Sequence, residues 1–182
     1  MKLYIFTEEP SMKEVLKIIL PKIGIARGHF QIIDFQGAGN LEKSLERQIR
    51  AVLSPGAGFL VLRDNDRGNC VKLKEQLLKK VVASGRKDRT KVRIVCQMLE
   101  SWFIGDSTAL EKSGYLKKKV PKRLRVCDPD LIGNPKKELM RLREGYGEIS
   151  GAKAIAPFLD AECNRSASFR HTIKAIRDLI AA

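Results

Sequence analysis

Two aspartates in one short loop are the first candidates for chemistry in this sequence. Asp64 and Asp66 follow the apolar, β-rich run at residues 59–62, and an amphipathic pattern begins a few residues later. A strand, an acidic loop and a helix in this order are typical of the carboxyl edge of a parallel sheet, where open α/β folds bind their ligands. Two carboxylates at such an edge can share one hard cation such as Mg²⁺.

Two more acidic residues follow other predicted strands. Glu8 comes after the strand expected at residues 2–6, and Glu100 follows the one expected at residues 92–96. Loops that follow parallel strands emerge at the same edge of a sheet, so we expect these carboxylates to lie near the Asp64–Asp66 loop. A metal ion held there could activate a water molecule and stabilise a leaving oxygen in phosphodiester cleavage.

Simpler roles are open to each of these residues. Loop aspartates often cap helices, and Arg63 and Arg67 could neutralise both aspartates in plain ion pairs. Glu8 could be an ordinary acid in the first turn of a helix, favoured by the helix dipole, and Glu100 could cap or pair locally. Asp106 suits an N-cap of the segment that follows it. Convergence at one sheet edge therefore favours a site more than any single residue does.

The apolar pattern that positions these residues predicts an α/β domain. Strand-like runs occur at residues 2–6, 29–35, 59–62 and 92–96. Helical patterns separate them, and this alternation predicts a Rossmann-like, mostly parallel four-stranded sheet flanked by helices. After Asp106 shorter helical segments and turns take over. Residues 1–106 are thus the predicted α/β core, and residues 107–182 a basic, mainly helical extension packed on the same domain.

Three local signals refine this outline. Pro21 should end or bend the first helix. Asn40 is a predicted N-cap of the second helix. In the third helix, at about residues 69–83, Cys70 shares the inward face with Leu77 and is expected to be buried.

The net charge of +14, from 35 Lys and Arg against 21 Asp and Glu, favours a polyanionic partner, and nucleic acid before a membrane. Residues 117–125 contain six basic side chains in nine positions and predict a phosphate-contacting arm, the alternative being a solvated loop. The predicted nucleic-acid-binding residues are Arg63, Arg67, Lys117, Lys118, Lys119, Lys122, Arg123 and Arg125.

The cysteines and the apolar runs indicate where the protein works. Cys70, Cys96, Cys127 and Cys163 form no C-x-x-C pair, which argues against a zinc site and predicts reduced, mostly buried thiols. No apolar run is long enough to span a bilayer, and the N-terminal apolar run is too short for a signal peptide. A cytoplasmic protein without a membrane partner is expected, with its oligomeric state open.

Over about residues 1–106 the sequence resembles the toprim (topoisomerase–primase) domain. In that family a glutamate follows the first strand and an Asp-x-Asp motif follows the third, and Glu8 and Asp64-Asn65-Asp66 occupy these places here. The whole chain, including residues 98–106 and 168–170, is similar to a family of small prokaryotic toprim-related proteins akin to nucleases of the OLD (overcoming lysogenization defect) type.

The resemblance implies a nuclease dependent on Mg²⁺ or Mn²⁺. Glu8 would be a metal ligand or general acid/base, Asp64 and Asp66 would hold metal, and Glu100 would complete a second metal site. The catalytic residues would be Glu8, Asp64 and Asp66. The resemblance also implies nucleic acid as a partner, a separately encoded ATPase as another, and a role in phage defence.

Two positions depart from the family pattern and leave an alternative open. The family has a glycine where this chain has Glu9, and an acidic residue where it has Met12, which we expect in the core. A catalytically inactive nucleic-acid-binding or partner subunit is the alternative. Phosphate chemistry on a small molecule is disfavoured, because the Gly37-Ala38-Gly39 segment lacks the remainder of a phosphate-binding loop.

Overall fold

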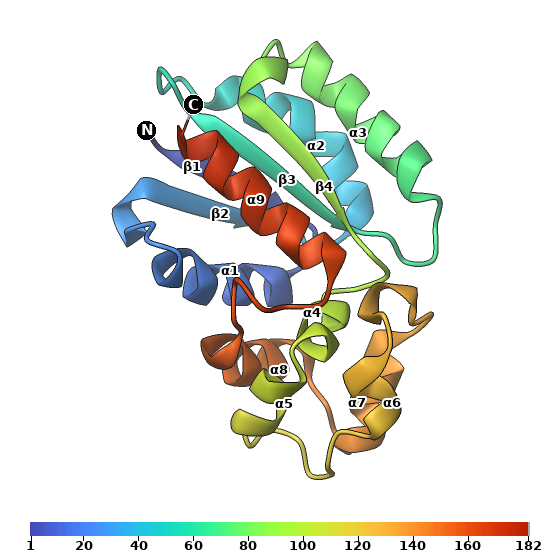
Figure 1. Cartoon of the computed structure of the whole chain (residues 1–182). Coiled ribbons are helices and arrows are strands. Elements are labelled where there is room, and N and C mark those ends of the chain that lie inside the picture. The colour runs from blue at the N-terminus through green and yellow to red at the C-terminus, as the bar shows by residue number, and fades with distance from the viewer. Residues whose placement is uncertain (182) are drawn as a thin grey trace.

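Four parallel strands form one sheet in the computed structural model, which describes residues 1–181. In the order β2-β1-β3-β4 they are β2 (Phe30–Asp34), β1 (Leu3–Thr7), β3 (Gly58–Asp64) and β4 (Thr90–Val95) (Figure 1). Every strand pairing is parallel, so the predicted α/β fold is confirmed. The chain runs outward from β1 to β2 and then crosses back to β3. Open α/β folds place their ligands at such a reversal, which here lies at the carboxyl ends of β1 and β3.

Helices cover both faces of the sheet, as predicted. One face carries α1 (Pro10–Lys22) and α9 (Ala167–Ala181), and the other carries α2 (Ala38–Ala51) and α3 (Cys70–Ala83). Side chains of β3 alternate between the two cores. Leu60 and Leu62 pack with α1 and α9, whereas Phe59 and Val61 pack with α2 and α3. This alternation follows from the two-residue repeat of a strand and sends Arg63 and Asp64 to opposite faces.

A group of short helices lies between β4 and α9, at the carboxyl end of the sheet (Figure 1). Its members are α4 (Glu100–Gly105), α5 (Ser107–Lys112), α6 (Lys122–Val126), α7 (Pro135–Leu142) and α8 (Glu148–Ile155). Single 3₁₀ turns occur at Arg27–His29, Lys87–Arg89, Pro129–Leu131 and Ala156–Phe158. The short helices share one hydrophobic core with the α1 face of the sheet. The boundary at residue 106 stays a prediction, since this core runs through both parts.

Strand β3 is longer than the sequence pattern predicted. The expected strand ended at residue 62, but Arg63 and Asp64 continue the ladder by pairing with Ile94 and Val95 of β4. Arg63 and Asp64 therefore have strand geometry, and the acidic loop begins only at Asn65.

Two local predictions are wrong. Helix α2 begins at Ala38 after Gly37, so Asn40 lies inside the helix, where its side-chain amide donates to the Phe35 carbonyl at 3.1 Å. Cys70 is exposed because it is the first residue of α3, beyond the end of β3. The expectation of mostly buried thiols fails as well, since Cys163 is exposed and Cys96 and Cys127 are half-buried, although all four are free.

The predicted core position of Met12 is confirmed, since this residue is 3% exposed. Trp102 and Phe103 are fully buried. The Trp102 ring packs edge-on against Phe169 of α9, and its indole N–H donates to the Ser168 hydroxyl at 3.1 Å. Helix α1 ends at Lys22, directly after Pro21. Among residues 1–181, none of the helices has the length and apolar character needed to cross a membrane.

The start of α9 is fastened to the end of α4 at a close backbone approach. The Asn164 side chain donates to the Trp102 carbonyl at 2.8 Å and accepts from the Ser166 N–H at 2.9 Å. Arg165 N–H donates to the Gly105 carbonyl at 3.0 Å. A Cβ at Gly105 would overlap the Asn164 side-chain oxygen and lie 2.9 Å from the Ser166 nitrogen.

We therefore expect Gly105→Ala to destabilise the protein by about 2 kcal/mol, because the added methyl group overpacks this junction. Gly39→Ala is the matched control, since nothing lies within 4 Å of a Cβ there. Inside helix α2 that change should stabilise the protein by roughly 0.5 to 1 kcal/mol. Urea unfolding of both variants measures the difference, and equal effects would contradict the close approach.

Candidate functional site

The carboxyl ends of β1 and β3 bring Glu8 and Asp64 together. Thr7 pairs with Leu62 across these neighbouring strands, so Glu8 follows β1 at the level where β3 ends. Glu8 and Asp64 are 8% and 6% exposed, and Asp66 is exposed in the loop beyond. The Asp64 carboxylate accepts the Leu99 N–H at 3.2 Å. The sheet thus gathers the predicted catalytic residues at one edge.

Backbone strain concentrates at the same edge. The non-glycine residues with positive φ in the described chain are Gln36, Asp66, Arg67 and Gln97. They directly follow β2, β3 and β4, and the Asp66 N–H donates to the Gln97 carbonyl at 3.0 Å. Such conformations cost on the order of 1–3 kcal/mol each and persist where the surrounding structure imposes them, often at functional sites.

Unpaired polar atoms concentrate there too. Five buried side-chain atoms at this edge have no hydrogen-bond partner: Glu8 Oε2, Arg63 Nε and Nη1, Asn65 Oδ1 and Gln97 Oε1. Buried polar atoms are nearly always paired in folded proteins. A cluster of unpaired ones indicates a place where a ligand, ion or water completes the contacts.

Glu100 reaches this region from the first residue of α4. Its carboxylate is 3% exposed and accepts a hydrogen bond from the Tyr146 hydroxyl at 3.1 Å. Burial raises the pKa of Glu100 to about 7. Its charge in turn contributes to the raised pKa of Asp64, so Glu100 belongs to the same electrostatic cluster.

The cluster contains charges that sequence reasoning missed. Glu9 lies at the N-cap of α1, and Glu148 is the first residue of α8. Lys136 of α7 pairs with Glu148, and that hydrogen bond raises the pKa of the lysine. No local signal marked Glu148, Lys136 or Tyr146, because they belong to the short helices whose packing the sequence pattern did not specify. Glu9 was visible as an acid at the start of the first helix and as a departure from a family pattern, but not as a member of the cluster.

The carboxyl groups of this cluster have raised pKa values. Burial, followed by the negative charge of Asp66, raises the pKa of Glu8 to about 7, although Arg63 opposes the shift. Burial and then the charges of Glu9, Glu8 and Glu100 raise the pKa of Asp64 well above its usual value. Burial and the neighbouring negative charges together thus favour the protonated forms of Glu8 and Asp64.

The two arginines beside the aspartates have separate partners. Arg63 Nε lies 3.8 Å from Glu8 Oε2, and Arg63 Nη2 lies 3.4 Å from Glu42 Oε1. Arg67 Nε donates to the Gly133 carbonyl at 2.9 Å. In the described chain neither aspartate forms an ion pair, so the alternative in which these arginines neutralise them is wrong.

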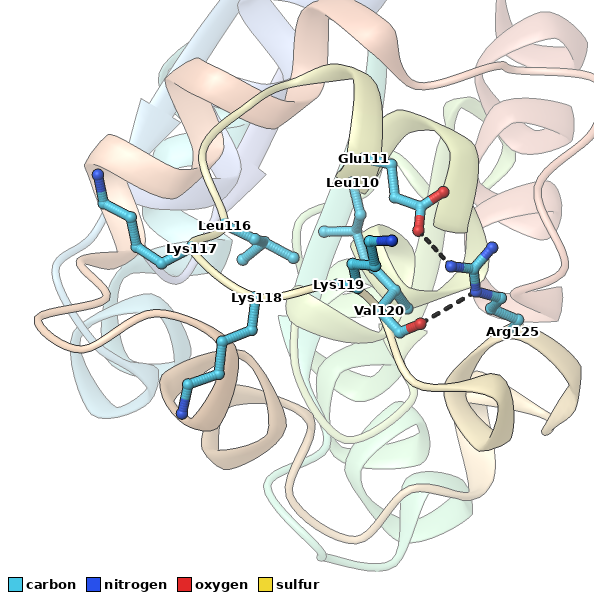
Figure 2. A pocket seen from close by; sticks show the side chains of 8 residues that line it. All are labelled: Leu110, Glu111, Leu116, Lys117, Lys118, Lys119, Val120 and Arg125. Atoms are coloured by element: carbon cyan, nitrogen blue, oxygen red, sulfur yellow. Dashed lines mark hydrogen bonds and ion pairs between the residues drawn. The ribbon is translucent and has the colours of Figure 1, made fainter.

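The basic segment lies at the far end of the short helices from the sheet (Figure 1). A hollow of about 490 Å³ lies here, and Figure 2 shows the side chains that line it: Leu110, Glu111, Leu116, Lys117, Lys118, Lys119, Val120 and Arg125. The three lysines are exposed, and Lys117 and Lys118 point outward. Arg125 bonds to the Glu111 carboxylate and the Val120 carbonyl, and Arg123 pairs with Glu138. Lys122 is exposed at the start of α6.

Asp106 stands outside the cluster. Its carboxylate caps α5 by accepting the Ala109 N–H at 2.9 Å, and it also accepts the Asp160 N–H at 2.9 Å. The predicted N-cap role of Asp106 is confirmed.

The carboxylate oxygens of Glu8, Asp64 and Asp66 suit a hard cation, but they are not arranged as a complete set of metal ligands. Among residues 1–181, no three His, Cys, Asp or Glu side chains are arranged closely enough to hold a metal ion. The unpaired Glu8 oxygen and the all-oxygen character of the cluster match the ligands that Mg²⁺ prefers, and Mg²⁺ keeps several of its waters. Binding at Glu8, Asp64 and Asp66 would therefore need bound waters or side-chain rotations to complete the coordination.

Together, the fold and this edge define an open parallel α/β protein with an acidic site at its strand-order switch point. The chain belongs to the family defined by the domain of unknown function DUF4276, whose model matches residues 7–177. No curated protein matches it.

Among solved structures, the chain is similar to the C-terminal region of the OLD protein of Burkholderia pseudomallei. The TM-score is 0.63 at 18% identity, covering 98% of each chain. It is also similar to the C-terminal region of the Xanthomonas campestris pv. campestris OLD protein, with a TM-score of 0.60, 17% identity and coverage of 98% of this chain and 95% of that one. At these identities the likeness shows a shared fold.

The raised carboxyl pKa values predict that the metal-free protein loses stability as pH rises. Glu8 and Glu100 have a pKa of about 7 in the folded protein against 4.5 ordinarily, so the folded state binds more protons between these values. The contribution of each carboxyl to the free energy of unfolding is fully present below about pH 4.5 and is lost as the pH rises through about 7. This loss amounts to up to roughly 3 kcal/mol for each carboxyl.

Urea unfolding between pH 5 and 8, with metal removed by a chelator, measures this slope. Glu100→Gln should make the slope shallower, because it removes one of the carboxyl groups that lose a proton over this range. A stability that stays level or rises over this range in the unsubstituted protein would contradict the raised pKa values.

Proposed function

We propose that this protein is a phosphodiesterase that cleaves nucleic acid with the help of Mg²⁺ or Mn²⁺. The supporting observation is the buried acidic cluster at the switch point of the sheet, with raised carboxyl pKa values and unpaired buried atoms beside it. Perturbed carboxyl groups in a crevice are characteristic of functional sites. Glu8 and Asp64-Asn65-Asp66 also match the two acidic motifs of the toprim pattern. The fold shared with OLD proteins agrees with this proposal.

Each side chain of the cluster has a proposed role. Glu8, Asp64 and Asp66 would hold the first metal ion, and Glu100 would contribute to a second. A divalent ion would supply charge stabilisation of the phosphate and a lowered pKa for bound water. Glu8 has a pKa of about 7, so its carboxyl can accept or release a proton near neutral pH. The hydroxyl of Tyr146 fixes the orientation of Glu100 by donating to its Oε1.

Basic side chains outline a path for the nucleic acid backbone. Lys136 lies beside the acidic cluster at the start of α7, and the other end of this helix anchors the lysine loop. There the Lys117 and Lys118 N–H groups both donate to the Leu142 carbonyl at 3.1 Å. The backbone of Lys136 and the anchor of the lysine loop are thus separated by roughly 10 Å along the helix axis.

Other implications of the resemblance remain proposals. They are a separately encoded ATPase partner, a role in phage defence and a cytoplasmic location. The oligomeric state stays open.

We expect Asp64→Asn and Glu8→Gln each to lower metal-dependent cleavage of plasmid and single-stranded DNA and RNA by roughly 100-fold or more, because each removes a proposed ligand or proton carrier. The same changes should raise the melting temperature of the metal-free protein, since a neutral amide relieves repulsion within the cluster.

Asp88→Asn is the control, because Asp88 is an exposed acid in the 3₁₀ turn before β4, at the opposite end of that strand. It should leave cleavage unchanged. Cleavage that persists in both Asp64→Asn and Glu8→Gln would rule out this site.

A nucleic-acid-binding protein without catalysis is the second candidate. It is favoured by the observation that no three side chains within residues 1–181 are already placed as metal ligands. Glu9 and Met12, at positions where the toprim pattern has a glycine and an acid, support it.

Both candidates predict a role for the lysine loop. Replacing Lys117, Lys118 and Lys119 with alanine should weaken nucleic acid binding and reduce the salt dependence of the affinity by up to about three charges. Fluorescence anisotropy at several salt concentrations measures this slope. A matched replacement of Lys43, Lys79 and Lys87, whose side chains belong to the α2–α3 side, should change it less. Equal slopes for the two triple variants would exclude the loop as the contact.

A further inference from the structure

Arg63 occupies an unusual position beside the acidic cluster. It is the penultimate residue of β3, its side chain is 13% exposed, and it points to the α2 face of the sheet. Its guanidinium lies between the carboxylates of Glu8 and Glu42, at 3.8 and 3.4 Å. Charge-assisted hydrogen bonds are normally 2.7–2.9 Å long. Arg63 is therefore held by two carboxylates without a close bond to either.

The donors of Arg63 are left incomplete by this arrangement. Nε and Nη1 are buried and form no hydrogen bond, and neither does Oε2 of Glu8, which faces Nε. A buried ion pair that serves only stability needs good geometry and satisfied donors to offset the loss of hydration. This pair has neither, although it lies where negative charge is most concentrated.

The other cations near the site are differently engaged. Lys136 is bonded to Glu148, and Arg67 donates to a backbone carbonyl and lies in the exposed part of the loop. In the described chain, Arg63 is the cation that forms an ion pair with Glu8. The Glu8 end of the cluster is thus neutralised by one loosely held guanidinium.

We propose that Arg63 is a resident counter-ion that competes with a divalent metal ion for the Glu8 carboxylate. When a metal ion binds Glu8, Arg63 moves to Glu42, which already attracts it from the opposite side. This inference rests on the metal site of the proposed function. It makes Glu42, which is not a proposed metal ligand, the residue that sets how readily Arg63 leaves.

The competition gives two substitutions opposite effects on metal affinity. Arg63→Gln removes the competing cation and should tighten Mn²⁺ binding by about tenfold or more. Glu42→Gln removes the alternative partner, leaves Arg63 on Glu8, and should weaken Mn²⁺ binding by a similar factor. Arg50→Gln is the matched control for net charge, because Arg50 pairs with Glu46 on the exposed surface of α2, and it should change nothing.

The experiment is a titration of the metal-free protein with Mn²⁺, with free Mn²⁺ measured by electron paramagnetic resonance. The wild type, Arg63→Gln, Glu42→Gln, Arg50→Gln and Asp64→Asn are compared. Melting temperatures with and without Mn²⁺ provide a second measurement. Arg63→Gln should lower the melting temperature without metal and show a larger Mn²⁺-induced increase than the wild type, whereas a merely structural arginine would lower it equally in both conditions.

The outcomes separate this inference from the proposed function. Binding that is lost in Asp64→Asn but unchanged or weaker in Arg63→Gln would overturn the competition and leave the metal site standing. No Mn²⁺ binding by any of the proteins would overturn both. If Arg63→Gln fails to fold, Glu42→Gln decides, since unchanged or tighter binding in that variant contradicts the proposal.

Discussion

The burial of several carboxylates side by side at one sheet edge is the constraint on which the candidate site depends. Parallel pairing of β1 with β3 fixes the backbone positions from which Glu8 and Asp64 emerge, so the two groups cannot separate without breaking the ladder. Asn65 and Asp66 are tied to the end of β4 by backbone hydrogen bonds of 3.0 Å each, so the loop cannot swing away either. Burial, and after it the neighbouring negative charges, raise the pKa values of Glu8 and Asp64, so these groups keep their protons to a higher pH than free carboxyls do. The buried carboxyl groups destabilise the fold locally, and the same arrangement favours the binding of a proton or another cation.

The sheet edge was predictable because strand ends are encoded locally. Apolar runs ending at an acidic residue identify where parallel strands stop, and parallel geometry then places Glu8, Asp64 and Asp66 at the same edge. The limit of β3 was misplaced because Arg63 and Asp64 are polar, so no apolar pattern marks their pairing with β4. The Cys70 prediction failed for a related reason. Helical spacing assigns a face, but it does not say how far a helix extends past the sheet that buries this face.

The remainder of the site depends on tertiary packing. Tyr146 and Glu148 follow a break between two short helices, and Lys136 follows a proline turn. Nothing near them in the sequence tells which way those helices fold back. Their approach to Glu100 and Glu9 is set by burial of Leu139, Ile155 and their neighbours against α1 and α4. Long-range packing of this kind is not contained in the periodicity of any one segment.

The junction between α4 and α9 has a consequence for how such proteins diversify. The chain leaves the sheet near Trp102 and returns near Asn164, and hydrogen bonds hold these two points side by side. The roughly sixty residues between them thus form an inserted segment whose two ends are held next to each other. Lengthening such a segment lowers the stability of the fold only slightly, since the entropic cost of closing a loop grows slowly with its length. The tip that carries the lysines can therefore be replaced or enlarged while the acidic edge keeps its geometry, so that these two parts of the surface can change independently.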